Sequence, residues 1–296
     1  MKSKNPKVCV IEPHGFCSGV TNAVKTARST LLSAPGERVY CLHQLVHNEI
    51  VVNELSRLGM VSVDDLNDVP DFSRVLFSAH GVAPDIRETA SKKHLDVIDT
   101  TCPFVARVHR EAADAAKKGI KTIVIGEAKH IEVKGVVGEI SAIGGEYAVV
   151  KDSNDVDAVD WDENSKIRYV VQTTLSEDDL EPTIERIRQR FPNAERSVAS
   201  CVCTATHDRQ KAVRDFVKNA LKKNEGNVGV LVLGSVRSAN TKRLAQIAEL
   251  SGSTTWRCAS LDEVSKIDFS KIDILGITAG ASTPESLLDE VLDFLD

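Results

Sequence analysis

EPHGFCSGV at residues 12–20 is the stretch around which the chain is organised. It follows the apolar run VCVI at residues 8–11 and precedes apolar residues at helical spacing, so Cys17 lies where a buried strand gives way to a helix. Two more cysteines occupy the same kind of position. Cys102 lies in DTTCP at residues 99–103, which follows a short apolar run. Cys203 follows a predicted strand at residues 197–200. This repetition predicts three similar units, each offering one thiol at the start of a helix.

The position of these three cysteines favours a metal or cluster site. The free amides and the dipole of a helix N-terminus stabilise a thiolate, and three thiolates around one point would leave one coordination position open. The alternative for any single cysteine is a small, buried hydrophobic side chain. We expect that alternative for Cys9, Cys41 and Cys258, whereas Cys201, two positions before Cys203, stays open between the two interpretations.

The composition excludes several classes of protein. The chain has 296 residues, 42% of them hydrophobic, which is enough for a sizeable core, and its net charge of −6 argues against non-specific nucleic-acid binding. No apolar run approaches the ~18 residues of a membrane span, and the short basic N-terminus has no signal-peptide apolar region behind it. We therefore expect a cytoplasmic protein without membrane or nucleic-acid partners, whose cysteines are reduced thiols, catalytic groups or metal ligands.

Short apolar strands alternate with helical patterns along the whole chain. This alternation predicts an α/β fold with mostly parallel sheets covered by helices. We expect three pseudo-equivalent α/β units, at residues 18–102, at residues 103–203, and at residues 204–296 together with 1–17, arranged around a central cluster. The N-terminal strand at residues 8–11 would then close the third sheet. No paired CxxC motif is present, so the fold must assemble any cluster from distant cysteines.

Polar side chains follow the predicted strands where ligands of parallel sheets bind, beyond the carboxyl ends. The candidate residues at these ends are His47 and His80 in the first unit, His130, Glu132, Thr173 and Thr174 in the second, and Ser238, Asn240 and Ser282 in the third. Together with the three cysteines they are expected to surround one cavity. The other histidines are expected to be structural or exposed, namely His14, His43, His94, His109 and His207.

These stretches resemble the 4-hydroxy-3-methylbut-2-enyl diphosphate reductase family, which catalyses the last step of the methylerythritol phosphate route to isoprenoids. Besides GFCSGV and DTTCP, the chain shares VHN at residues 46–48, SAHGV at 78–82, H-x-E-V-x-G at 130–135, QTTLS at 172–176, C-x-A-T-x-x-RQ-x-AV at 203–213, GS-x-x-S-x-N-x-x-RL at 234–244 and TAGAS-x-P at 278–284. The motifs follow the family's order from near the start of the chain to near its end, and together they are highly specific.

The resemblance implies three α/β units around a [4Fe-4S] cluster held by Cys17, Cys102 and Cys203, in which the iron without a cysteine binds the substrate oxygen. It implies that Glu132 is the proton donor and that Thr173 hydrogen-bonds near that oxygen. The implied reaction removes the allylic hydroxyl reductively, giving isopentenyl and dimethylallyl diphosphate with electrons from an external ferredoxin or flavodoxin. The residues expected to bind the substrate, mainly at its diphosphate, are His47, His80, His130, Thr174, Ser238, Asn240 and Ser282.

The chain departs from the family pattern in four places. Ile131 stands where the family has proline, Ala239 where a second serine is common, and Asp208 where asparagine is common, and the chain ends soon after Leu295 without the longer tail of many members. Two alternatives follow: a paralogue that uses the same open-iron cluster as a hydratase or dehydratase on another substrate, and a cluster-bearing sensor. The retained Glu132 favours an enzyme, because a sensor needs no proton donor.

Overall fold

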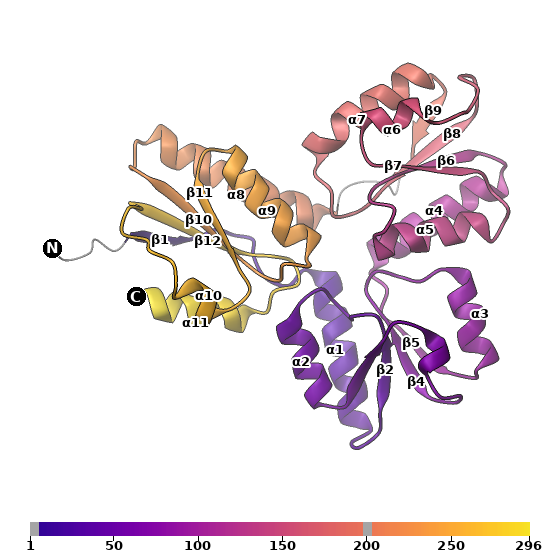
Figure 1. Ribbon diagram of the computed structural model, residues 1–296, viewed down its shortest axis with the longest axis horizontal. Coiled ribbons are helices and arrows are strands. Elements are labelled where there is room, and N and C mark those ends of the chain that lie inside the picture. Colours follow the sequence, from indigo (N-terminus) through magenta and orange to yellow (C-terminus); the bar gives the residue numbers. More distant parts are fainter. Residues whose placement is uncertain (1–5, 198–202) are drawn as a thin grey trace. The chain divides into compact units, whose positions relative to one another are not determined.

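Three four-stranded sheets, in each of which all strands are parallel, form the framework of the protein (Figure 1). The computed structural model describes residues 6–197 and 203–296. The chain forms two compact units, one comprising residues 1–20, 47–51 and 204–296, and the other comprising residues 21–46 and 52–203. One sheet belongs to the first of these units and the other two belong to the second. The predicted α/β fold with parallel sheets is confirmed.

One of the two sheets of the second unit has the strand order β3-β2-β4-β5. Its strands are β2 (Val39–Leu42), β3 (Met60–Val63), β4 (Arg74–Phe77) and β5 (Asp96–Asp99). In Figure 1, α1 (Ser18–Ser33) and α2 (Glu49–Arg57) lie on one side of it and α3 (Pro84–Lys92) on the other, and a 3-10 turn, η1, covers Leu66–Asp68. Apolar residues of β4, η1 and α3 pack into a common core.

The other sheet of the second unit has the strand order β7-β6-β8-β9. Its strands are β6 (Lys121–Ile125), β7 (Tyr147–Val150), β8 (Ile167–Val171) and β9 (Ala194–Arg196). One face packs against α4 (Pro103–Lys117) and α5 (Ile131–Ser141), and the other packs against α6 (Ser153–Asp157) and α7 (Glu177–Arg190). The side chains of β6 alternate between these two cores, as the period of two in a strand requires.

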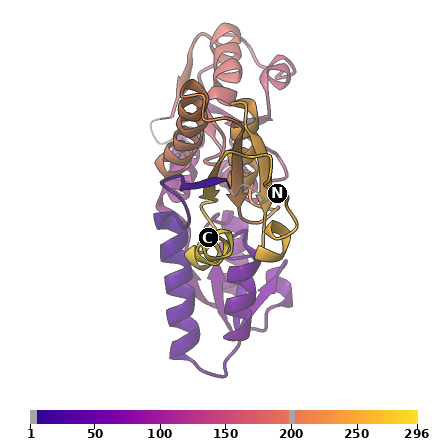
Figure 2. The same ribbon diagram turned by 90° about the vertical axis from the view of Figure 1, so that its left-hand side faces the viewer.

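The sheet of the first unit has the strand order β1-β12-β10-β11. Its strands are β1 (Lys7–Val10), β10 (Val228–Leu233), β11 (Thr254–Cys258) and β12 (Ile274–Ala279). Helices α8 (Thr204–Lys222) and α9 (Ala239–Leu250) bury their apolar faces against one side, and α10 (Leu261–Val264) and α11 (Glu285–Leu295) bury theirs against the other. Figure 2 shows α11, in yellow, beside the strands of this sheet.

The three sheets share one topology. When β1 is counted as the last strand of its sheet, the first strand of each sheet (β2, β6 or β10) has the second strand at its outer edge and the third and fourth strands on its other side. The fourth strand of the last sheet is β1, which comes from the N-terminus and pairs with β12, as the sequence predicted. Cys17, Cys102 and Cys203 each come after the fourth strand of a sheet. The structure thus bears out the threefold repetition of strand order, whereas the domain boundaries stay a prediction.

The number of strands in each sheet was predicted wrongly. The sequence indicated three strands for each of the three predicted α/β units, but each sheet has a fourth strand, β3, β7 or β11, at its outer edge. These strands are short and only partly buried, and polar residues interrupt the apolar sequence in β3 and β11. The strand predicted at residues 197–200 is also displaced, because β9 ends at Arg196 and residues 198–200 lie outside the described part.

No helix in the described part of the chain combines the length and the apolar character that crossing a membrane requires.

Candidate functional site

The three cysteines singled out from the sequence each stand at the start of a helix. Cys102 is the N-cap residue of α4, and Cys17 and Cys203 directly precede α1 and α8. All three are half-buried. The unpaired backbone amides and the dipole of a helix N-terminus favour the thiolate form that binds metal.

The same backbone hydrogen bond holds each of these cysteines to its own sheet. In each case the amide of the cysteine donates to the carbonyl oxygen of a residue two positions beyond the third strand of that sheet. The bonds are Cys17 to Ala281 at 3.1 Å, Cys102 to Ala79 at 3.0 Å and Cys203 to Thr173 at 3.3 Å. The repetition extends from strand order to the placement of the thiol, so the three cysteines are equivalent in local geometry.

The other described cysteines differ from these three. Cys41 and Cys258 are buried, and burial raises the pKa of the Cys41 thiol to about 12 and that of the Cys258 thiol to about 11. Both therefore remain neutral thiols that pack like small hydrophobic side chains, as predicted. Cys9 packs against the core of its sheet. Cys201, whose role the sequence left open, lies outside the described residues.

Glu132 and Thr173 form the central polar pair of the second unit. Glu132 lies in the first turn of α5 and is 2% exposed. Its Oε1 accepts the Thr173 amide at 2.7 Å, and its Oε2 accepts the Thr173 hydroxyl at 3.1 Å. Because the Thr173 carbonyl accepts the amide of Cys203, one threonine connects the carboxyl group to a cysteine.

Burial is the main influence on the charge of Glu132. Desolvation raises the pKa of this carboxyl group above its usual value, and the two hydrogen bonds from Thr173, together with the charge of His109, oppose the rise. A carboxyl group with a raised pKa retains its proton to higher pH and can serve as a general acid near neutrality. The sequence placed Glu132 at the end of a polar loop, whereas the structure places it inside the helix that follows.

His130 and His80 lie close together in the second unit. Their rings meet edge to face with centroids 6.1 Å apart. His130 is the N-cap of α5, and its Nδ1 accepts the Glu132 amide at 3.2 Å. The neutral imidazole therefore carries its proton on Nε2, which can donate to a ligand. His80 Nδ1 lies 3.3 Å from the Ser78 hydroxyl.

Thr174 is half-buried next to this group. Its hydroxyl oxygen accepts a hydrogen bond from the side-chain amide of Gln172 at 2.8 Å. Gln172 also accepts the amide of Glu127 at 3.0 Å, so it connects the loop after β6 to the loop after β8. These bonds fix the backbone around Thr173 on both sides.

A second polar group belongs to the first unit. Asn240 Oδ1 accepts the Ala281 amide at 2.9 Å, and the Ser282 hydroxyl donates to the carbonyl oxygen of His47 at 3.1 Å. Ser238 is the N-cap of α9. Ala281 also accepts the amide of Cys17, so the loop after β12 joins this cysteine to Asn240. Five sequence-predicted residues of this unit are therefore connected through one loop and one helix start.

The Asn240 side chain carries an unused donor. Asn240 is 5% exposed, and its Nδ2 has no hydrogen-bond partner among the described residues. A buried donor without a partner costs about 1–3 kcal/mol. The cost is recovered when an acceptor binds, so this amide is suited to an oxygen-rich ligand.

The family follows from comparison with known proteins. The model of the family described as "LytB protein" matches residues 8–296. The 4-hydroxy-3-methylbut-2-enyl diphosphate reductase of Tolumonas auensis is 38% identical over 292 residues, covering 98% of this chain and 91% of the relative. The chain belongs to the LytB protein family.

Further relatives agree with this assignment to the LytB family. The enzyme of the same name from Actinobacillus succinogenes is 37% identical over 98% of this chain and 90% of the relative. The solved E-1-hydroxy-2-methyl-but-2-enyl-4-diphosphate reductase of Plasmodium falciparum has a TM-score of 0.89 at 33% identity, covering 98% of this chain and 88% of that one. A second solved reductase, described as the terminal enzyme of the non-mevalonate pathway, has a TM-score of 0.69 at 30% identity, covering 97% and 98%.

The predicted site residues of this LytB protein fall into two groups, one in each unit. Within either unit, the described His, Cys, Asp and Glu side chains form no group of three or more that is arranged to hold a metal ion. Cys17 lies in the first unit, and Cys102 and Cys203 lie in the second. A common site of the three thiols therefore remains a proposal.

Sequence reasoning missed Arg209, which supports the Cys17 loop of this LytB protein. Arg209 lies on α8 and is 5% exposed. Its guanidinium donates to the carbonyl oxygens of Gly15 at 2.8 Å and His14 at 3.2 Å, directly before Cys17. A buried arginine is unusual, but its burial depends on contacts between distant parts of the chain, so no local pattern in the sequence indicates this role.

Proposed function

We propose that this protein is a 4-hydroxy-3-methylbut-2-enyl diphosphate reductase. The substrate loses its allylic hydroxyl group as water while one C–H bond forms, which consumes two electrons and two protons and yields isopentenyl or dimethylallyl diphosphate. The observation that carries the proposal is the buried Glu132–Thr173 pair, connected by a backbone hydrogen bond to Cys203. The full-length relationship to reductases of this name supports the choice of substrate.

The donor set fits an iron–sulfur cluster. Cys17, Cys102 and Cys203 are half-buried and placed at helix starts, and thiolates are the usual ligands of such clusters. Three cysteines would hold a [4Fe-4S] cluster with one iron open to another ligand. Once bound, the cluster supplies the two low-potential electrons and a Lewis-acidic iron, neither of which protein side chains provide.

The diphosphate is proposed to bind through neutral and charge-assisted donors. Asn240 Nδ2, which has no hydrogen-bond partner among the described residues, is suited to this purpose, and we assign the same role to His130. Hydrogen bonds from such donors to phosphate oxygens are short and strong because the acceptor is charged. We assign the same role to the other polar residues at strand ends, namely His47, His80, Thr174, Ser238 and Ser282.

A proton is proposed to reach the leaving oxygen through Thr173. The Thr173 amide occupies Oε1 of Glu132, so a protonated Glu132 carries its proton on Oε2. That proton is then donated to the Thr173 oxygen, 3.1 Å away, and the threonine hydroxyl is free to turn its own hydrogen towards the substrate. Proton transfer from a positioned acid contributes about 10²–10⁴-fold to the rate.

The electrons are proposed to come from an external protein. The chain has no GxGxxG fingerprint for a nicotinamide or flavin cofactor, so it has no evident internal source of electrons. A ferredoxin or flavodoxin supplies low-potential electrons of the kind that the reaction requires.

An anaerobic assay tests this proposal. Purified protein is mixed with 4-hydroxy-3-methylbut-2-enyl diphosphate and a reduced viologen dye, and dye oxidation is compared with product formed. We expect two electrons consumed for each molecule of isopentenyl or dimethylallyl diphosphate. Turnover of the substrate without dye oxidation would instead identify a redox-neutral hydratase or dehydratase, and no turnover in cluster-loaded protein would contradict an enzymatic role.

A further inference from the structure

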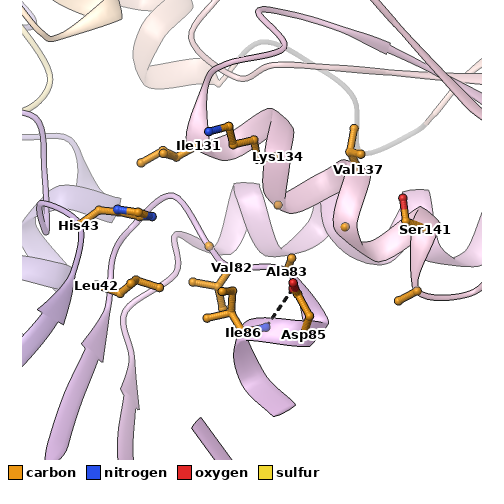
Figure 3. Close-up of a pocket in the computed structure, with 14 residues that line it drawn as sticks. Leu42, His43, Val82, Ala83, Asp85, Ile86, Ile131, Lys134, Val137 and Ser141 are labelled. Carbon is orange, nitrogen blue, oxygen red and sulfur yellow. Dashed lines mark hydrogen bonds between the residues drawn. The ribbon is translucent and has the colours of Figure 1, made fainter. Parts of the chain in front are cut away.

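A pocket of about 610 Å³ lies in the second unit, between the loop after β4 and helix α5 (Figure 3). The volume is within the range of about 300–1,000 Å³ that is usual for small-molecule sites. None of the residues that line it is a proposed cluster ligand or substrate-binding residue. The proposed reaction therefore does not account for this pocket.

The walls of this pocket are mainly apolar. Leu42 comes from the end of β2, Val82 and Ile86 come from the segment after β4, and Ile131 and Val137 come from α5. These side chains are drawn around the pocket in Figure 3. Apolar walls of this kind favour a hydrocarbon chain, since each buried CH₂ group stabilises the complex by about 0.8 kcal/mol.

Positive charge lies on one side of the pocket. In Figure 3 the Lys134 side chain runs towards Ile131, on the side of the pocket where His43 lies. Among the described residues, Lys134 is exposed and forms no ion pair. Asp85 is on the opposite side in this view, and its Oδ1 accepts the Ile86 amide at 2.9 Å.

The backbone of His43 is held in an uncommon conformation. Its φ is 60°, and its amide donates to the Val63 carbonyl oxygen at 2.7 Å. A residue other than glycine in the left-handed region is uncommon, and such residues concentrate at ligand sites. The conformation brings the imidazole to the lining of the pocket, where its Nδ1 lies 3.5 Å from Oδ1 of the exposed Asp64 carboxylate.

We propose that this pocket binds a small amphipathic anion, with its hydrocarbon chain along the apolar wall and its phosphate or carboxylate head at Lys134 and His43. The pocket borders the catalytic loops, because Gly81 follows His80 and Ile131 lies between His130 and Glu132. The volume, lining and charge of this pocket do not depend on the proposed reaction. Prenyl phosphates and fatty acids are two sources of this chemistry.

Calorimetry with a series of alkyl phosphates tests the proposal. Butyl, hexyl and octyl phosphate are titrated into the anaerobically purified protein, with inorganic phosphate as the head group alone. We expect affinity to rise up to about fourfold for each added CH₂ group. Affinity that is independent of chain length would overturn the proposal, as would octyl phosphate that does not bind.

Matched variants locate the binding site. Lys134→Ala is expected to weaken octyl phosphate binding about two- to fivefold, the range for an exposed ion pair, while Lys129→Ala, at an exposed lysine outside the lining, leaves it unchanged. Ser141→Trp, which fills the pocket from its exposed rim, is expected to abolish binding, and Asn240→Asp in the other unit is expected to preserve it. The reverse result, loss with Asn240→Asp and none with Ser141→Trp, would refute the assignment.

Two further titrations identify the source of the ligand. Tighter binding of geranyl diphosphate than of decanoate assigns a prenyl phosphate, and the opposite order assigns a fatty acid. Whichever ligand binds more tightly, its affinity must fall in Ser141→Trp. A ligand whose affinity is unchanged in this variant binds elsewhere and contradicts the proposal.

Discussion

Single residues determine the proton chemistry, and Glu132 is the most informative of them. The carboxyl group is buried, and it accepts two hydrogen bonds from Thr173, while the charge of His109 also favours its ionised form. Burial outweighs these stabilising contacts, so the pKa is raised. A raised pKa extends to higher pH the range in which the carboxyl group can act as an acid.

Glu132→Gln is expected to reduce single-turnover reduction about 10²–10⁴-fold. Glutamine preserves the size and both hydrogen bonds to Thr173, but its amide cannot deliver a proton. The measurement is stopped-flow kinetics under reducing, anaerobic conditions, with iron content recorded in parallel. Glu127→Gln, at an exposed residue of the preceding loop, is the control and should retain the wild-type rate.

The pH dependence of the same step supplies a second check on Glu132. The acid form is the active form, so the rate should fall as pH rises through the raised pKa of Glu132. This descending limb should be absent from the residual rate of Glu132→Gln. A variant rate within about threefold of wild type would remove Glu132 from the mechanism.

Asn240→Asp separates ligand binding from folding. The aspartate still accepts the Ala281 amide through one oxygen, but it replaces the unpaired Nδ2 donor with a negative charge. Losing the donor alone costs about 1.5–3 kcal/mol, so KM should rise at least ten- to a hundredfold with unchanged iron content. Asn219→Asp adds the same charge at an exposed site on α8 and should leave KM unaltered. Equal KM values in the two variants would exclude Asn240 from the diphosphate site.

Among the secondary-structure elements, helix α5 carries most of the site in its first turn. His130 caps it, Glu132 follows within the turn, and the helix then packs against α4 and α3. The start of one helix therefore positions both His130, which is the cap and a proposed phosphate donor, and the acid Glu132. Effects on stability and on binding can be separated there by the choice of substitution.

His130→Ala and His130→Asn are expected to differ in the stability of the folded protein, whereas both are expected to weaken substrate binding. Alanine removes the cap and should lower the unfolding free energy by about 1 kcal/mol, whereas asparagine is a good N-cap and should preserve it. Both lose the Nε2 proton, so both should raise KM. Thermal unfolding and steady-state kinetics measure the two quantities. Wild-type KM in His130→Asn would show that His130 serves only as a cap.

Gly138→Ala is expected to destabilise α5 although alanine is the better helix former. A Cβ at this position would lie 2.3 Å from the Cβ of Ala83, so the gain of about 1 kcal/mol in helix propensity is exceeded by a clash that costs about 1–3 kcal/mol. Ala83→Gly removes the opposing methyl group and should restore stability in the double variant. Additive effects in thermal unfolding would contradict this contact.

The elements that the sequence failed to predict share a physical cause. β3, β7 and β11 are edge strands that bury few of their residues, and the sequences of β3 and β11 carry neither a continuous apolar run nor a strict alternation. The central strands β10 and β12 are buried at every position and were recognised without difficulty. Pairing to a neighbouring strand, which is a long-range contact, decides where an edge strand forms.

For the whole molecule, local patterns predicted the fold class and the three cysteines, because a strand, a polar residue and a helix start are adjacent in sequence. The contacts that tune the site are not local. Glu132 and Thr173 are 41 residues apart, and Arg209 reaches Gly15 across 194 residues. Neither the burial of Glu132 nor the arginine support of the Cys17 loop could be predicted, since both depend on how the sheets bring distant loops together.

The threefold repetition is the feature of the whole molecule that the proposed function uses. Each sheet presents one cysteine through the same amide bond to the end of its third strand, so removing any one thiol should have the same consequence. Alkoxide and apolar side chains replace a thiolate poorly as cluster ligands.

Iron and sulfide content of anaerobically purified cysteine variants tests the central claim most directly. Cys17→Ser, Cys102→Ser and Cys203→Ser should each lose most of the iron and the visible absorbance, while Cys9→Ser and Cys41→Ala retain both. The account is contradicted if any of the three serine variants keeps the wild-type iron and sulfide content, or if Cys201→Ala bleaches the protein while Cys203→Ser does not.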